Sequence, residues 1–272
     1  MTRRTPTIAG AALLAASLVF AGGCEIQAGE GDFSVSLWQG QARDTWSRTY
    51  TLPPGGRIEI VNVNGEIRAE ATDGPAVEVT AERTASATSD EAARELLGRI
   101  EMREEIGDRQ VRIETVSPRI RMGGQKVSYV VRVPAGVHVD LRTVNGGVRL
   151  DGVGGEVRAA STNGGVRGRV AAASVVEART TNGGVELELS GALAADGRLQ
   201  LTSVNGGIRL KVPEDTRAEV SARCTNGRVS VSDLPFTVVG EQTRRRLQGT
   251  LNGGGARVDL QTTNGGVSIA RS

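Results

Sequence analysis

From residue 137 onward, apolar and polar residues alternate on both sides of a recurring Asn-Gly dipeptide. Three and five residues after each Asn the side chain is nearly always apolar, as at Val148 and Leu150. Six and four residues before the Asn, apolar side chains recur with the same parity, as at Val139 and Leu141. Alternation with a period of two is typical of a β-strand with one buried face. The pattern therefore predicts two short strands that meet at a corner at each Asn-Gly.

From Asn145 to Asn226 the corners recur at intervals of 18, 19, 23 and 21 residues, and the last interval, of 38 residues, equals two steps of 19. Seven copies are present, and the corner residues are Asn64, Gly65, Asn145, Gly146, Asn163, Gly164, Asn182, Gly183, Asn205, Gly206, Asn226, Gly227, Asn264 and Gly265. A spacing of roughly 20 residues is that of solenoid coils. We predict an all-β chain that forms a single-stranded β-solenoid, similar to a parallel β-helix, with about 20 residues per coil. A meander of Asn-Gly hairpins is the alternative, but it gives no reason for a uniform period.

Each corner has its own internal pattern. The residue two before the Asn is small and mostly polar, and these residues are Asn62, Thr143, Ser161, Thr180, Ser203, Cys224 and Thr262. Stacked coils would place them in one column, where they can form hydrogen bonds along the stack, and would place the Asn side chains in an inward ladder. The first Gly never varies, which fits a positive φ or a close backbone approach. The second Gly is replaced by Glu66 and Arg228.

The region before the repeats is also rich in β-strand patterns, with one helix. Alternation begins at Trp46, and a domain is predicted over residues 45–272, with the Asn-Gly repeats in 137–272. An insertion of about 84–126 contains Ser89, a good helix N-cap, followed by acidic residues in the first turn. Residues 100–106 and 109–116 are predicted to form a hairpin around Gly107-Asp108.

The N-terminus has the features of a bacterial export signal. Arg3-Arg4 precede an apolar run at residues 8–21, which is too short to span a bilayer comfortably. Residues 21–24, Ala-Gly-Gly-Cys, resemble a lipobox, although Ala21 replaces the usual Leu. We expect a lipoprotein signal peptide at 1–23, a lipidated Cys24, and a flexible tether at 24–44. An ordinary signal peptide is the alternative, and we favour the general export route over the twin-arginine route.

Composition and charge limit the classes of partner that we expect. The chain has 33 Lys and Arg against 31 Asp and Glu, and loss of Arg3 and Arg4 with the leader leaves 31 of each. A neutral mature chain gives no electrostatic reason to expect nucleic acid or an anionic membrane surface as a partner. Aromatic residues make up only 3% of the chain, and there are 37 glycines. This composition favours thin, regular β-structure.

Signals of catalysis and of metal binding are absent from the sequence. His138 is the single histidine, and neither a Gly-x-Ser-x-Gly nucleophile motif nor a phosphate-binding P-loop occurs. The Asn-Gly-Gly corners lack the Gly-Gly-x-Gly-x-Asp spacing of calcium-binding β-rolls. We therefore predict no enzyme, no cofactor and no metal, and a run of three arginines at 244–246 that is a solvated loop. Cys224 is expected to be a small buried residue and not a nucleophile.

The polar positions between the apolar ones supply the candidate binding face. The outward residues selected are Arg142, Arg158, Glu177, Arg179, Glu186 and Arg223. Neighbouring coils would align such residues as cross-strand ion pairs. A polysaccharide-active enzyme that uses Glu177 or Glu186 is a less favoured alternative.

Residues 46–270 resemble the bacterial DUF4097 family, whose members are described as proposed adhesins. The resemblance rests on Pro-Gly-Gly followed by alternating apolar residues and Asn-Gly at 54–65, on Val-Pro-Ala-Gly at 133–136, and on the Ser/Thr-x-Asn-Gly units. It implies a cell-envelope protein, exported and lipid-anchored to the membrane, that acts as an adhesin or scaffold for an unknown protein or envelope polysaccharide. An accessory protein in envelope-stress signalling is the alternative. The oligomeric state stays open.

Overall fold

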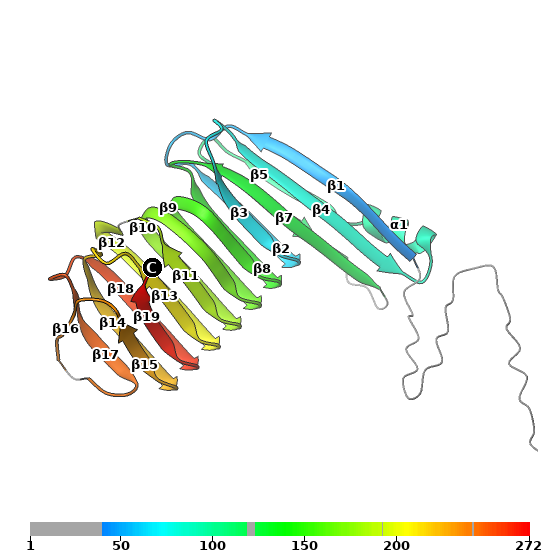
Figure 1. Ribbon diagram of the computed structural model, residues 1–272. Helices are drawn as coiled ribbons and strands as arrows, with labels where there is room; N and C mark the ends of the chain where they lie inside the picture. Colours follow the sequence, from blue (N-terminus) through cyan, green and yellow to red (C-terminus); the bar gives the residue numbers. More distant parts are fainter. Residues whose placement is uncertain (1–39, 119–122, 192, 241) are drawn as a thin grey trace, which may run out of the picture.

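The computed structural model describes residues 40–118, 123–191, 193–240 and 242–272. The predicted leader, Cys24 and most of the predicted tether therefore lie outside the described residues. Within the described ranges the chain folds into nineteen strands and one helix, and the strands form one continuous hydrogen-bonded sheet (Figure 1). The prediction of an all-β chain with a small helical insertion is confirmed.

Two layers of strands, here called wall A and wall B, meet at the Asn-Gly corners. Wall A holds the strand before each corner: β2 (Arg57–Asn64), β8 (His138–Asn145), the second halves of β9 (Val148–Asn163) and β10 (Val166–Asn182), β12 (Leu193–Asn205), β14 (Ala218–Asn226) and β18 (Ala256–Asn264). Wall B holds the strand after each corner: β3 (Ile67–Thr72), the first halves of β9 and β10, β11 (Val185–Leu189), β13 (Ile208–Val212), β15 (Val229–Ser232) and β19 (Val267–Arg271). β9 and β10 each bend from wall B into wall A of the next coil, with register shifts at the bend.

Equivalent strands of neighbouring coils pair in parallel and in register. Wall A has the order β2, β8, β9, β10, β12, β18, β14, and Asn is aligned with Asn at each step. Wall B follows the same order with β3, β9, β10, β11, β13, β19 and β15. This in-register pairing agrees with stacked coils and not with a meander of hairpins.

The spatial order of the coils departs from the sequence order. The last pair of strands, β18 and β19, lies between the β12–β13 pair and the β14–β15 pair. The long interval between Asn226 and Asn264 therefore does not contain an additional coil of the stack. It holds β16 (Phe236–Val238) and β17 (Arg246–Leu251), and β17 pairs antiparallel with β14. The hairpin covers the edge of β14 that the inserted coil leaves free.

One apolar core fills the space between the two walls. The inward columns predicted from the alternation are buried, and the largest fully buried side chains include Ile58, Ile60, Leu150 and Leu199. Each such side chain stabilises the fold by about 1.5–3 kcal/mol relative to exposure. Because the columns are continuous along the stack, every coil packs on the coils before and after it.

The first glycine of each corner is required by close backbone approach. A Cβ added at Gly164 would lie 2.1 Å from the carbonyl oxygen of Gly146, and the other first glycines give 2.0–2.4 Å. The second glycine is less confined, since a Cβ at Gly147 would lie 3.2 Å from the nearest carbonyl oxygen. This difference explains why Glu66 and Arg228 are tolerated at the second position.

Two columns of hydrogen bonds run along the corners. The small polar residues donate to the first-glycine carbonyl of the neighbouring coil, as Thr180 Oγ1 does to Gly164 at 2.7 Å, which confirms the predicted column. From Asn145 onward, each Asn side chain also donates to the Asn of the coil before it in the stack, at 2.7–2.9 Å. The predicted inward direction of this ladder is wrong, because Asn145 and its successors are exposed. The chain turns at the Asn, so the side chain points out of the corner.

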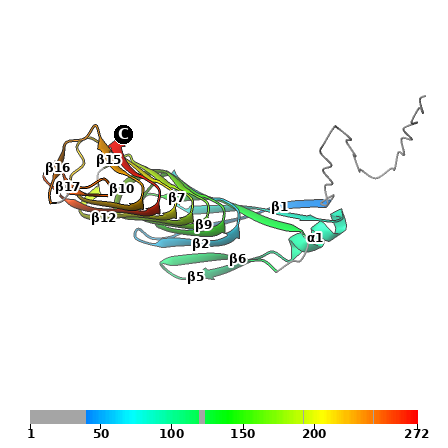
Figure 2. The same ribbon diagram turned by 90° about the horizontal axis from the view of Figure 1, so that it is seen from below.

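The N-terminal region extends both walls beyond the stack. β5 (Glu101–Ile106) and β6 (Gln110–Val116) form the predicted hairpin and continue wall A beside β2, while β7 (Gly124–Pro134), β4 (Val77–Ala87) and β1 (Gly40–Tyr50) continue wall B beside β3. The two layers are separated in Figure 2. α1 (Asp90–Gly98) contacts β1 and β4, and the predicted N-cap Ser89 accepts from the backbone N–H of Ala92. β1 begins at Gly40, five residues before the predicted domain boundary.

Candidate functional site

Four of the six predicted face residues lie together on the outside of wall A. Arg142 on β8 donates to Asp140 at 2.7 Å and to Glu59 of β2 at 3.3 Å. Glu59 and Asp140 are almost fully buried although they carry charge, and Arg112 of β6 also pairs with Glu59. The buried carboxylates are therefore stabilised by guanidinium groups that cover them.

A second ion-pair cluster lies on the neighbouring strands. Arg158 pairs with Glu156 at 3.0 Å and with Glu177 of β10 at 3.7 Å. Arg179 pairs with the same Glu177, and Arg57 reaches Glu156 at 2.7 Å. We call these two clusters together the charged lattice of wall A. The lattice is a network and not a set of exposed single pairs, which contribute little to stability, and it forms an ordered charged surface over the two buried carboxylates.

A pocket of ≈ 280 Å³ opens between the two clusters, and Asp140, Arg142, Arg158, Glu177 and Arg179 line it together with Ala159 and Ala160. Ala160 lies in the same outward column as Arg142 and Arg179, directly between them. Its methyl group stands where its neighbours carry long side chains, which leaves the space open. The pocket presents three guanidinium groups and two carboxylates.

The sequence pattern did not single out Glu59, Asp140, Arg57 or Glu156. Glu59 and Asp140 occupy the same outward column as Arg158 and Glu177, five residues before an Asn. Reading down that column, instead of selecting residues coil by coil, would have found both carboxylates.

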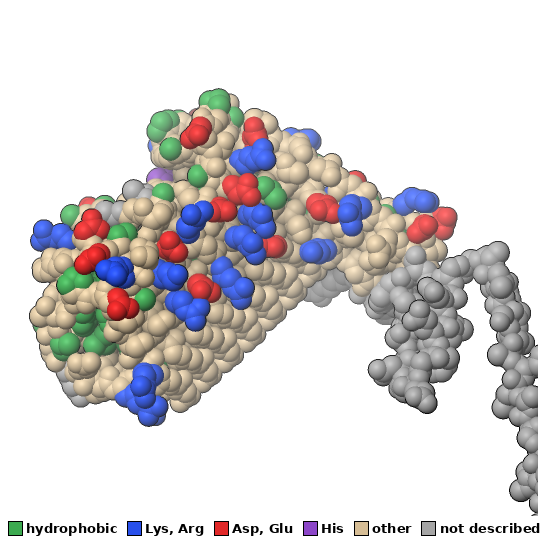
Figure 3. Space-filling model, in the orientation of Figure 1, with side chains coloured by type: hydrophobic (Ala, Val, Ile, Leu, Met, Phe, Trp, Pro, Cys, Tyr) green, Lys and Arg blue, Asp and Glu red, His purple; other side chains and the backbone are tan. Residues whose placement is uncertain are grey.

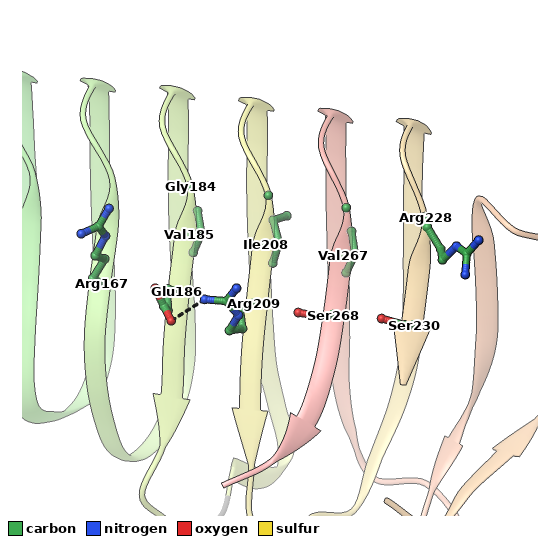
Figure 4. Close-up of a pocket in the computed structure, with 12 residues that line it drawn as sticks. Arg167, Gly184, Val185, Glu186, Ile208, Arg209, Arg228, Ser230, Val267 and Ser268 are labelled. Carbon is green, nitrogen blue, oxygen red and sulfur yellow. Dashed lines mark hydrogen bonds and ion pairs between the residues drawn. The ribbon is translucent and has the colours of Figure 1, made fainter. Parts of the chain in front are cut away.

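Glu186 and Arg223 are not part of this lattice. Glu186 follows a corner and therefore faces outward from wall B, where it pairs with Arg209 at 2.8 Å (Figure 4). The two residues lie in a groove of ≈ 400 Å³ whose lining includes Gly184, Gly207 and Gly266. Arg223 is on wall A, but at the far end of the stack on β14, where it donates to Gln261 at 2.6 Å. The six predicted residues thus occupy three separate places.

The single histidine and two titratable groups with raised pKa values have structural contacts. His138 is half-buried, and its Nδ1 accepts from the backbone N–H of Glu156 at 3.0 Å, so it supports the bend of β9. Burial raises the pKa of the Tyr129 phenol to about 12. The hydrogen bond to Glu114 raises the pKa of Arg112. Among the described residues no group of three His, Cys, Asp or Glu is placed to hold a metal ion.

Charge on the surface is mixed in sign. Figure 3 shows Arg and Lys side chains interspersed with Asp and Glu across the face in view. The one helix in the described ranges is not of a length and hydropathy that would let it cross a membrane.

The family assignment rests on a family model that matches more than half of the chain. A model of the family described as Toastrack DUF4097 matches residues 98–270, which is more than half of the sequence. The chain belongs to the Toastrack DUF4097 family. The in-register corners and the charged lattice are therefore features of a Toastrack domain, and the resemblance found in the Asn-Gly units is confirmed.

Solved structures with a similar arrangement are distant in sequence. A proposed cell adhesion protein from Clostridium sporogenes has a TM-score of 0.49 and 12% identity, over 84% of this chain and 100% of its own. A proposed adhesin from Bacteroides fragilis has a TM-score of 0.36 and 12% identity, over 83% of this chain and 97% of its own. Both TM-scores lie below 0.5, so neither structure is evidence for what this Toastrack chain binds. No curated protein matches the sequence.

Proposed function

We propose that this Toastrack protein is a non-catalytic, lipid-anchored protein of the cell envelope that uses wall A as an adhesive or scaffold surface. In this proposal the two walls are the faces of a single-stranded β-solenoid with about 20 residues per coil. The partner is an extended envelope polysaccharide or protein that lies across the strands. Lipid attachment at Cys24 holds the domain at the membrane.

The observation that carries the proposal is the charged lattice with its open pocket at Ala160. Parallel strands in register place successive side chains of one column about 4.8 Å apart, so a partner with regularly spaced polar groups meets a regularly spaced surface. The lattice is already ordered by its own ion pairs, which lowers the conformational entropy lost on binding. Because both signs of charge line the pocket, it suits a partner that carries both carboxylate and amino or hydroxyl groups.

The proposal is tested by filling the pocket without removing a charge. Ala160→Gln places a longer neutral side chain between Arg142 and Arg179, and we expect retention on isolated cell-wall sacculi, or crosslinking to a partner in native membranes, to fall about tenfold. Thr202→Gln is the matched control, because Thr202 lies in the same column beyond Arg179. The proposal is wrong if the wild-type chain binds neither preparation, or if Ala160→Gln binds as well as Thr202→Gln.

A further inference from the structure

The end of the stack that β14 and β15 form carries five arginines that form no ion pair with another described residue. Arg223, Arg228, Arg244, Arg245 and Arg246 all lie there, and none of them forms an ion pair within the described ranges. This contrasts with the lattice of wall A, in which Arg142, Arg158 and Arg179 each pair with a carboxylate. A chain with nearly equal numbers of acidic and basic residues thus has, at one end, a group of arginines that pair with no described carboxylate.

Two of these arginines are held directly opposite one another. β14 and β17 pair antiparallel, and the register sets Arg223 against Arg246. Like charges in directly opposed positions of a sheet are destabilising. An anion bound between the two guanidinium groups would offset this repulsion.

The backbone of the adjacent turn prevents the arginines from moving apart. The carbonyl oxygen of Arg245 accepts from the backbone N–H of Cys224 at 2.9 Å, and that of Arg244 accepts from Val229 at 3.0 Å. Within the turn, Thr243 Oγ1 accepts from the backbone N–H groups of Arg245 and Arg246 at 3.3 and 3.1 Å. The run at 244–246 is exposed, as predicted, but it is tied to the end of the stack.

A pocket of ≈ 350 Å³ lies where these side chains converge. It is lined by Arg223, Cys224, Thr225, Thr243, Arg245, Arg246, Gln261 and Thr262, a set without a carboxylate. Glu219 and Asp259, which lie on β14 and β18, line a separate groove together with Arg257. The pocket therefore combines three guanidinium groups with neutral hydroxyl and amide groups.

We propose that this pocket is an oxyanion site that takes a phosphate group, either free or carried on an envelope lipid or polymer. A guanidinium donates a planar fork of N–H groups that matches phosphate oxygens. A phosphate monoester carries about −1.5 to −2 charge near neutral pH and three acceptor oxygens, so it can meet all three arginines and remove the repulsion between Arg223 and Arg246. The site is distinct from the pocket at Ala160 and does not depend on the function proposed for wall A.

Thermal unfolding of the full chain in detergent distinguishes a specific phosphate site from a surface that is only basic. In a phosphate-free buffer of low ionic strength, Arg246→Gln relieves the opposed pair, so its Tm should rise above that of the wild type. Inorganic phosphate should raise the Tm of the wild type, whereas this increase should disappear in Arg246→Gln and in Arg223→Gln. By titration, each of these variants should bind phosphate at least about tenfold more weakly, which is the effect expected for the loss of a hydrogen bond to a charged group.

Controls and alternative phosphate sources complete the test. Arg169→Gln removes an exposed arginine that pairs with Asp151 at 3.1 Å on wall B, and it should leave the phosphate response unchanged. Cosedimentation with vesicles that contain phosphatidic acid, whose headgroup is a phosphate monoester, and binding of soluble polyphosphate identify the carrier of the phosphate group, and each should require Arg223. A phosphate-induced Tm increase of equal size in Arg223→Gln, Arg246→Gln and the wild type would overturn the site, as would no increase in any of them.

Discussion

The first glycine of each corner is the most constrained residue of the stack. In Gly164 the missing side chain lets the backbone approach Gly146 of the neighbouring coil, and the Gly146 carbonyl oxygen is also fixed by a 2.7 Å hydrogen bond from Ser161. Neither glycine can move away from the other without breaking hydrogen bonds to the neighbouring coils. The requirement that all these positions share is therefore a contact between coils, and Gly65, Gly146 and Gly265 in addition have a positive φ.

Alanine substitution should lower the free energy of unfolding more at the first glycine of a corner than at the second. Gly164→Ala forces a Cβ to 2.1 Å from a carbonyl oxygen, and we expect a loss of about 3 kcal/mol or more, at the upper end for overpacking. Gly184→Ala, a second-position glycine with its nearest contact at 3.2 Å, should lose less than about 1 kcal/mol. Urea unfolding measures both, and equal losses would contradict the close-approach explanation.

At the scale of strands, the two ends of the stack differ from its middle. In the middle, each Asn side chain both donates to one neighbour and accepts from the other, and the following Gly N–H donates to the next Asn carbonyl, as Gly164 does to Asn182 at 3.0 Å. The β14–β15 pair ends the stack. In the part of the chain that the structure describes, Asn226 Oδ1 accepts no hydrogen bond, and Gly227 N–H donates to no backbone carbonyl.

This difference predicts which asparagine deamidates first. Deamidation begins when the Gly nitrogen attacks the Asn Cγ and ammonia leaves, and the hydrogen bonds of the ladder hold both groups away from that reaction. We expect Asn226 to deamidate several-fold faster than Asn163 or Asn182 when the folded protein is kept at mildly alkaline pH. Peptide mapping by mass spectrometry measures the rates. In denaturant the three rates should become similar, and similar rates in the folded state would show that the ladder does not protect.

At the scale of the whole molecule, charge is distributed unevenly along the stack. The charges of the wall A lattice pair with one another, while the arginines at the β14–β15 end form no ion pair with another described residue. Net charge alone gave no reason to expect an anionic partner. The three-dimensional arrangement changes that expectation locally, since it brings Arg223 of one strand beside Arg245 and Arg246 of a distant loop.

The proposed lipid anchor at Cys24 determines whether the whole molecule is held at the membrane. If Cys24 is lipidated, Cys24→Ala should move the protein from the membrane fraction to the soluble fraction, because its acyl chains no longer hold it in the bilayer. Fractionation followed by immunodetection measures the change, and Cys224→Ala is the matched control. Unchanged membrane association of Cys24→Ala would refute lipidation as the anchor.

The sequence by itself determined the strands, the corners and the inward columns. Period-two alternation and an invariant glycine act over a few residues, so they can be recognised without a structure. The helix cap at Ser89 and the β5–β6 hairpin were predictable for the same reason.

Only the tertiary structure decided how these local units are arranged. The coils are alike in sequence, so nothing local indicates that β18 and β19 insert beside β12 and β13. The outward direction of the Asn ladder and the position of Glu186 on wall B depend on how the chain turns at each corner. The three-arginine pocket depends on contacts between segments that are far apart in sequence. Such contacts arise from packing between whole elements, which the local pattern does not encode.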